Sequence, residues 1–339
     1  MINISGLQGS ILGPIFFLWY INDLPNSSNL LTFLFADDTQ GLASGKNLPQ
    51  LIDDVNTEIL KWARWFRANK MKVNTSKTKY IIFHTKGKPI NTQGKTLYYN
   101  DNEQTTDQNP LLVSELDRIH NNHPIPENRS YKLLGIHFDE NLTFNHHIST
   151  LISKLNKSYY CISRAKNILP TKALTSLYYA LFHSHLTYCP SIISCTSKSN
   201  IEKISKIQRK IIRTITHSPY RSNTDHLFTK LNIMPYHALI DYSKLTIMHS
   251  IHYNYAPESL RNLWPTNLTR EINHNLRNTN DYSIPRINYS FFSRSPSITF
   301  TTLWNSSNNI TPHINPTTFK IALRNSLMIQ NPPPIHHPE

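Results

Sequence analysis

Two adjacent acidic residues, Asp37 and Asp38, stand between two short apolar runs at residues 30–36 and 39–44. Two such runs joined by a two-residue polar turn predict a tight β-hairpin with both carboxylates at its tip. Two carboxylates held this close repel each other unless a cation neutralises them. Mg²⁺ prefers one or two protein carboxylates together with phosphate oxygens. The pattern therefore predicts a magnesium-binding hairpin of the kind that serves phosphoryl transfer.

An acidic pair is a weak signal by itself, and the chain contains a second one at Asp53-Asp54. That pair lies in a segment, residues 48–66, whose apolar residues recur at helical spacing, so it predicts an amphipathic helix. Acidic side chains near the amino terminus of a helix are favoured by its dipole and need no metal. The first pair differs because it interrupts two predicted strands.

The balance of charge favours an anionic partner. Lys and Arg total 35 against 21 for Asp and Glu, which gives a net charge of +14. Nucleic acid is the commonest partner of such a chain, and an ordinary basic protein is the alternative. Hydrophobic residues make up 39% of the chain, enough for packed cores.

Other features of the composition exclude several classes of site. The apolar run at residues 11–21 is interrupted by Gly13-Pro14 and is shorter than the roughly 20 residues of a membrane span. Three scattered cysteines predict neither a disulfide framework nor a zinc site, and they fit a reducing, intracellular compartment, nuclear or cytoplasmic. The pairs His146-His147 and His336-His337 lack further ligands at metal spacing, so we expect them to be solvated.

Periodicity divides the chain into a mixed part followed by a helical part. A buried helix is expected at residues 10–20, with Pro14 in its first turn, and strands are expected at 78–84 and 131–138. The polar segment 87–130 resembles an insertion, with a hairpin near 96–99 and a short helix at 111–120. From residue 145 onward helices dominate, at 171–185, 200–216, 235–253 and 317–327. The fold class is α+β.

Five segments resemble, in order, the palm and thumb of reverse transcriptases from non-LTR retrotransposons, the jockey-like elements. They are Gln8-Gly9-Ser10-Ile11-Leu12-Gly13-Pro14 with Tyr20-Ile21-Asn22-Asp23-Leu24-Pro25; Phe35-Ala36-Asp37-Asp38-Thr39; Trp62 with Asn69, Asn74 and Lys77-Thr78-Lys79; Tyr131-Lys132-Leu133-Leu134-Gly135; and Asp139 through His147. Weaker marks follow at Gln208-Arg209 with Arg213, and at Trp304-Asn305 before Phe319-Lys320.

The resemblance implies a domain organisation and a chemistry. A partial palm, an antiparallel sheet with helices, would span 1–145 with the insertion at 87–130. A helical thumb or connection would span 146–255, and an irregular region with one late helix would span 256–339. The implied activity is RNA-directed DNA polymerisation with Mg²⁺, using an RNA template, a DNA primer and deoxynucleoside triphosphates, without a membrane partner.

The resemblance also assigns roles to residues. Asp37 would be the principal catalytic metal ligand and Asp38 its partner. Gln8, Gly9 and Lys77 would contact the template or the nucleotide. Lys77 is equally well explained as a solvated turn lysine. Leu134 and Gly135 would contact the primer, although Gly135 could equally mark a bulge. A basic helix face would contact the nucleic-acid backbone, although it could equally be an ordinary solvated face. This face is formed by Lys203, Lys206, Arg209, Lys210 and Arg213.

Two positions depart from the family pattern. Leu7 stands where the family usually has Pro, and the palm aspartate expected upstream of Gln8 is missing, because no acidic residue precedes it. Two-metal catalysis needs carboxylates from both sides of the ions. We therefore expect a truncated chain that alone binds magnesium poorly and does not polymerise. The alternatives are a non-catalytic nucleic-acid-binding remnant and, with less support, a helical scaffold with an incidental acidic pair.

Overall fold

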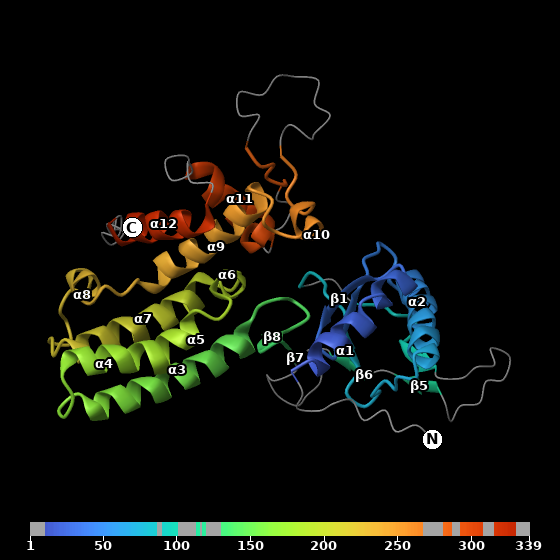
Figure 1. Ribbon diagram of the computed structural model, residues 1–339, viewed down its shortest axis with the longest axis horizontal. Coiled ribbons are helices and arrows are strands. Elements are labelled where there is room, and N and C mark those ends of the chain that lie inside the picture. Colours follow the sequence, from blue (N-terminus) through green and yellow to red (C-terminus); the bar gives the residue numbers. More distant parts are fainter. Residues whose placement is uncertain are drawn as a thin grey trace. The chain divides into compact units, whose positions relative to one another are not determined.

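The computed structural model describes residues 11–86, 90–100, 113–115, 117–119, 130–266, 281–286, 292–307 and 315–329 (Figure 1). The chain divides into two compact units. The first comprises Met1–Tyr131 with Asp139–Asn141, and the second comprises Lys132–Phe138 with Leu142–Glu339. The division thus falls within residues 131–142, close to the expected boundary at 145. Residues 256–339 belong to the same unit as residues 146–255.

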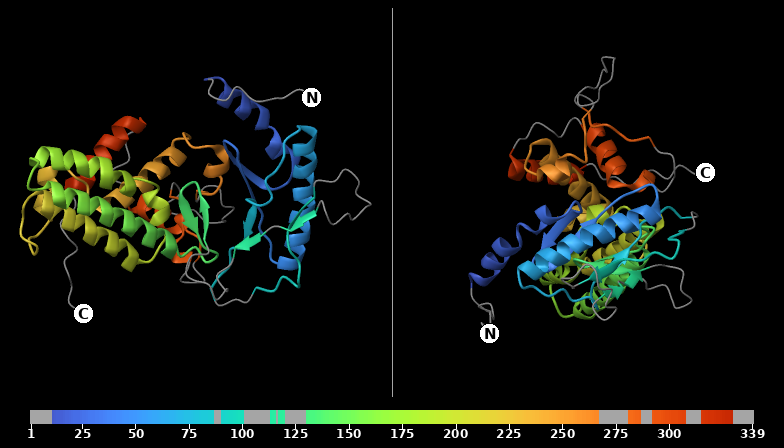
Figure 2. Two further views of the ribbon diagram at one scale, coloured as in Figure 1. Left: turned by 90° about the horizontal axis from the view of Figure 1, so that it is seen from below. Right: turned by 90° about the vertical axis from the view of Figure 1, so that its right-hand side faces the viewer.

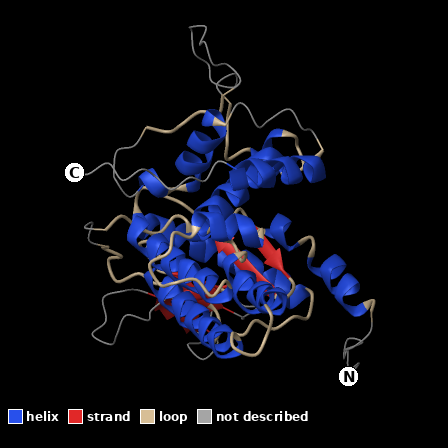
Figure 3. Ribbon diagram, turned by 90° about the vertical axis from the view of Figure 1, so that its left-hand side faces the viewer, coloured by secondary structure: helices blue, strands red, loops and turns tan. Residues whose placement is uncertain are grey.

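Helices dominate the described residues, and the strands form small two-stranded sheets, which confirms the α+β class (Figure 3). Strand β1 (Leu31–Phe35) pairs antiparallel with β2 (Asp38–Leu42), and β4 (Tyr98–Asn100) pairs antiparallel with β5 (Val113–Glu115). Strand β3 (Lys79–Ile81) pairs parallel with β6 (Asp117–Ile119), and β7 (Tyr131–Leu133) pairs with β8 (Ile136–Phe138).

The prediction of a helix at residues 111–120 is wrong, because β5 and β6 occupy the described part of that segment. A helix of ten residues has little stability of its own. Here β3 and β4 each offer a strand to pair with, and backbone pairing across the chain decides the outcome.

The first unit is built on helix α2 (Leu48–Ala68), whose side-chain cap is Asn47. One face of α2 packs on Leu97 and Tyr99. Near its carboxyl end, Phe66 packs with Ile21 of α1 (Gly13–Ile21) and with Leu24 of the 3₁₀-helix η1 (Leu24–Ser27). Figure 2 shows α2 beside the strands of this unit.

Helix α1 begins next to Pro14, as expected, but the prediction that it is buried is wrong. Ile21 alone is buried within it, and Trp19 is 80% exposed. The reason is that α1 carries apolar side chains on all of its faces. Contact with α2 through Phe17 and Ile21 covers one side, so the remaining side chains stay exposed.

In the second unit, α3 (Asn145–Ala165) and α7 (Lys198–Ile215) lie side by side and run in the same direction (Figure 1). Asn200 donates from Nδ2 to Oδ1 of Asn145 (2.8 Å) near the amino ends of both helices. Further along both, Nζ of Lys210 lies 4.3 Å from the ring centroid of Tyr159. The chain returns between them through α4 (Thr171–Leu177), the π-helical turn η2 (Tyr178–His183) and α5 (Ser184–Leu186), followed by α6 (Pro190–Ile193).

The carboxyl-terminal part is more regular than expected. After α8 (Asp225–Leu231), α9 (Tyr236–His252) and α10 (Glu258–Arg261) come a 3₁₀ turn η4 (Phe292–Arg294), α11 (Pro296–Ser306) and α12 (Pro316–Ile329). Helix α12 matches the late helix that the sequence predicts, whereas α11 was not predicted. Both pack on α9, with the ring of His249 stacked 4.0 Å from that of Phe319.

None of the helices in the described ranges is long and apolar enough to cross a lipid bilayer.

Gln208, at the centre of α7, joins three elements of the second unit. Its side chain is 1% exposed. Nε2 donates to the hydroxyl of Tyr178 (2.9 Å) and to the carbonyl of Met234 (3.0 Å), and Oε1 accepts from the backbone N–H of Tyr236 (2.7 Å). A single amide therefore satisfies a buried hydroxyl in η2 and two backbone groups at the start of α9.

We expect Gln208→Leu to destabilise the second unit by about 2–4 kcal/mol, because it leaves a buried hydroxyl, carbonyl and N–H unpaired. Urea unfolding followed by circular dichroism measures the loss. The matched control is Lys206→Leu on the exposed face of the same helix, which should stay within about 0.5 kcal/mol of the parent. Equal stability of the two variants would show that the amide is not a structural tie.

Candidate functional site

The predicted hairpin is present, with its turn one residue earlier than expected. Phe35 pairs with Asp38, so the turn residues are Ala36 and Asp37, and Asp38 is the first residue of β2. Ala36 has φ +51°, in the left-handed region that costs a residue with a Cβ about 1–2 kcal/mol. Two-residue hairpin turns require such values, which the twist of the strands imposes. Both aspartates are exposed.

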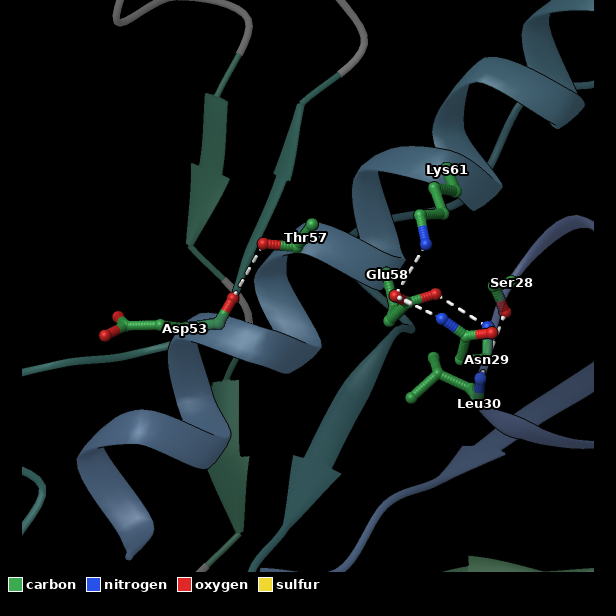
Figure 4. A network of polar contacts seen from close by, with 7 residues as sticks. All are labelled: Ser28, Asn29, Leu30, Asp53, Thr57, Glu58 and Lys61. Atoms are coloured by element: carbon green, nitrogen blue, oxygen red, sulfur yellow. Dashed lines mark hydrogen bonds and ion pairs between the residues drawn. The ribbon is translucent and has the colours of Figure 1, made fainter.

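Glu58 of α2 fixes the segment that leads into this hairpin (Figure 4). Its Oε2 accepts from the backbone N–H of Asn29 (2.6 Å), and its Oε1 accepts from Nδ2 of Asn29 (3.2 Å). Lys61 donates to the same carboxylate (2.7 Å). The hydrogen bond from Lys61, followed by that from Asn29, lowers the pKa of Glu58 below its usual range. The carboxylate therefore stays charged and holds the entry to β1 against α2.

A glycine allows the second strand of the hairpin to lie close to α2. A Cβ on Gly41 would lie 2.6 Å from the indole of Trp62. Glycine is thus needed for β2 to approach this ring. Trp62 belongs to the sequence segment after the hairpin that carries the family resemblance. The two exposed carboxylates are consequently presented by a hairpin whose entry segment is hydrogen-bonded to α2 and whose second strand lies against the same helix.

The other residues predicted to contact nucleotide or template are only partly described. Lys77 is exposed in a turn where its N–H donates to the carbonyl of Asn74 (3.1 Å). Both explanations of Lys77 remain open. Gln8 and Gly9 lie outside the described residues.

Leu134 and Gly135 occupy the turn of a second hairpin, β7–β8. The single strand expected across residues 131–138 is therefore wrong. Both turn residues have positive φ, +43° for Leu134 and +85° for Gly135, the combination that a tight hairpin turn requires. Gly135 is thus a turn residue and not a strand bulge.

Tyr188, which follows α5, fixes this turn. Its hydroxyl donates to the carbonyl of Leu134. A Cβ on Gly135 would lie 3.2 Å from the Tyr188 ring. The glycine therefore allows the turn to lie against the aromatic ring. Tyr188 was not predictable from the sequence, because no local pattern links it to a turn more than fifty residues earlier.

The basic residues of α7 fall into two groups. Lys203, Lys206 and Lys210 are exposed, while Ile204, Ile211 and other side chains on the opposite face are buried. The two arginines are engaged within the unit: Arg209 pairs with Glu202, and Nε of Arg213 donates to the carbonyl of Ser222 (2.8 Å). The three lysines are thus the members of the predicted set that remain most accessible to an anionic partner.

The described residues contain no group of three or more His, Cys, Asp and Glu side chains arranged to hold a metal ion. Asp37 and Asp38 supply the carboxylate oxygens that Mg²⁺ prefers. Two carboxylates fit an ion that completes its shell with waters and phosphate oxygens, but not a closed protein cage.

Comparison with known proteins identifies relatives over two thirds of the chain. It is 25% identical over 237 residues to the probable RNA-directed DNA polymerase from transposon X-element of Drosophila melanogaster, covering 66% of this chain and 23% of that protein. It is 22% identical over 238 residues to the RNA-directed DNA polymerase from mobile element jockey of the same species (67% and 23%). The probable RNA-directed DNA polymerase from transposon BS is 24% identical over 239 residues (67% and 24%).

The chain is similar in sequence to RNA-directed DNA polymerases of non-LTR mobile elements. These relatives confirm the resemblance found in the sequence and support a reverse-transcriptase domain. The matched region spans about a quarter of the length of the relatives. No family model matches the chain, and no solved structure matches it significantly.

We expect Tyr188→Phe in this reverse-transcriptase relative to loosen the β7–β8 turn, because the ring stays and the donor to Leu134 is lost. Hydrogen exchange over residues 131–138 should become several-fold faster, corresponding to about 1 kcal/mol. Tyr188→Ala, which also removes the ring, should have a larger effect. Tyr160→Phe, an exposed tyrosine on α3, is the control. Unchanged exchange in Tyr188→Phe would contradict the assignment.

Proposed function

We propose that the chain is part of an RNA-directed DNA polymerase and that Asp37 and Asp38 are its metal-binding carboxylates. The observation that carries the proposal is the exposed acidic pair on a hairpin anchored to α2 by Glu58 and Trp62. A nucleotidyl transfer requires carboxylates placed rigidly where phosphate oxygens arrive. Similarity to polymerases of mobile elements supports the same reaction.

In this proposal the primer 3′-hydroxyl attacks the α-phosphate of a deoxynucleoside triphosphate, and pyrophosphate leaves. Mg²⁺, when bound, neutralises the charge that gathers on the phosphate oxygens. Asp37 and Asp38 would hold the ions, and Lys77, Gln8 and Gly9 would contact the nucleotide or the template. Leu134 and Gly135 present the backbone of the β7–β8 turn to the primer.

The first 36 residues contain one acidic residue, Asp23, which directly precedes η1. It lies in the loop after α1 and not on a strand beside β1 and β2. We therefore propose that the residues before the hairpin do not supply the further carboxylate needed for two-metal catalysis, and that the chain tested alone does not polymerise.

A non-catalytic nucleic-acid-binding function is the second candidate. The exposed row of Lys203, Lys206 and Lys210 favours it, because three cations on one helix face match the charge of a phosphate backbone. This row would bind nucleic acid whether or not the carboxylate pair is completed.

The catalytic proposal is tested by primer extension on an RNA template with Mg²⁺. We expect no extension by the 339-residue chain, and extension by a version that carries the upstream palm segment of the jockey relative. In the active version Asp37→Ala should lower the rate about a hundredfold or more, because a metal ligand is lost.

Asp53→Ala is the matched control, since Asp53 also belongs to an acidic pair but lies on α2 and pairs with Lys95. It should retain the parent rate. An active Asp37→Ala variant would show that the hairpin aspartates do not hold the metal.

The binding proposal is tested by fluorescence anisotropy with a labelled primer–template duplex between 50 and 200 mM salt, about the range over which phosphate contacts weaken. Replacing Lys203, Lys206 and Lys210 by Gln should reduce the slope of log K against log salt by about 2–3, close to 0.9 for each lost contact. Replacing the exposed Lys172, Lys230 and Lys320 instead should change the slope much less. Equal slopes in the two variants would exclude the α7 row as the binding face.

A further inference from the structure

Three histidines of the second unit lie together where β8 meets the start of α3. The ring centroid of His137 is 4.7 Å from that of His146 and 6.1 Å from that of His147. The backbone N–H of His137 donates to Nδ1 of His147 (3.4 Å). His147 is 8% exposed, so the expectation that the His146-His147 pair is solvated is wrong for this residue. Its place four residues before buried Leu151 is the signal that reveals it.

The neighbouring charges that lower the pKa of these histidines come from basic groups. Lys132 on β7 and Lys154 on α3 act on His137 together with His146, and Lys154 also acts on His147 and on His185 of α5. The next carboxylates along the chain are engaged elsewhere. Asp139 accepts from the backbone N–H of Asn141 (3.2 Å), and Glu140 lies 3.6 Å from Nε2 of His84. Four elements, β7, β8, α3 and α5, thus contribute six basic groups to this region.

Burial, followed by the neighbouring His146, Lys132 and Lys154, lowers the pKa of His137 below its ordinary value. Burial also lowers the pKa of His147 to about 4. The buried His147 therefore stays neutral near pH 7 and can accept the N–H of His137. Adding protons to the rest of the cluster without an anion increases the repulsion among these like charges.

We propose that Lys132, His137, His146 and Lys154 form a binding site for a phosphate group, and that binding is coupled to proton uptake by His137. Phosphate oxygens accept hydrogen bonds and carry negative charge, so they match a cluster of N–H donors and ammonium groups. This site does not depend on Asp37 or Asp38, and it goes beyond the proposed polymerase function.

The sign of the coupling follows from the charges. A bound phosphate favours the charged imidazole and raises its pKa, so the complex holds more protons than the free protein. Affinity should therefore rise as the pH falls, because His137 takes up its proton at a higher pH in the complex than in the free protein. Each proton taken up contributes at most a tenfold gain in affinity for each pH unit.

The experiment uses the 339-residue chain and two probes, inorganic phosphate and a labelled oligothymidylate, between pH 5.5 and 7.5 at constant ionic strength. Thermal unfolding in phosphate against chloride reports the first probe, and anisotropy reports the second. We expect the affinity for the oligothymidylate, whose phosphodiesters keep their charge over this range, to rise several-fold to tenfold per pH unit. The affinity for inorganic phosphate should rise less, because this anion loses charge as the pH falls. His137→Gln/His146→Gln should flatten this dependence, and the exposed pair His217→Gln/His226→Gln should preserve it.

Lys132→Gln/Lys154→Gln, which alters only exposed side chains, keeps the test decisive if the histidine variant folds poorly. It should weaken binding of the probe several-fold at every pH. A pH response with the oligonucleotide alone would assign the site to the phosphodiester backbone, and a response with both probes to phosphate groups in general. If the cluster variants bind both probes like the parent, the proposal is wrong, whatever the polymerase tests show.

Discussion

The second unit depends on one buried amide. Gln208 lies where α7, the π-helical turn η2 and the start of α9 meet, and it pairs with a group from each of the latter two. Buried polar groups without partners cost more than a hydrogen bond gains, so this amide fixes how those elements sit against one another. The same helix then presents Lys203, Lys206 and Lys210 on its opposite face. The position of the basic row is therefore set by a neutral core contact.

The first unit carries two like charges on a short hairpin. Three features position this hairpin: a carboxylate that binds the segment before β1, a glycine that lets β2 approach Trp62, and a positive φ at Ala36. These contacts rest on a single helix, α2. Exposed carboxylates on a rigid support cost little to keep charged in water, and they meet a cation without rearrangement.

Long periodic helices such as α2, α7 and α9 were predictable from the sequence, because their apolar residues follow one face. Features that depend on distant partners were not. Strands β5 and β6 form because β4 and β3 pair with them. Helix α11 contains four β-branched residues in eleven, so its propensity is low, and burial of Phe300 and Trp304 stabilises it. The acidic pair was found from spacing. Glu58, which supports its hairpin, and Tyr188, which supports the separate β7–β8 hairpin, act through contacts between remote segments.

The proposed primer contact at Leu134 and Gly135 and the proposed phosphate site at His137 lie on the same β7–β8 hairpin. Tyr188 fixes its turn at Leu134, and His147 binds the backbone of its second strand at His137. His137 follows Gly135 by two residues, which corresponds to about 7 Å of extended chain. A nucleic-acid strand advances about 3.4 Å for each nucleotide. A strand whose end lies at the turn would therefore bring a phosphate to the histidine cluster about two nucleotides away. One hairpin would then position the primer end and bind its backbone, and the affinity for that backbone would depend on pH.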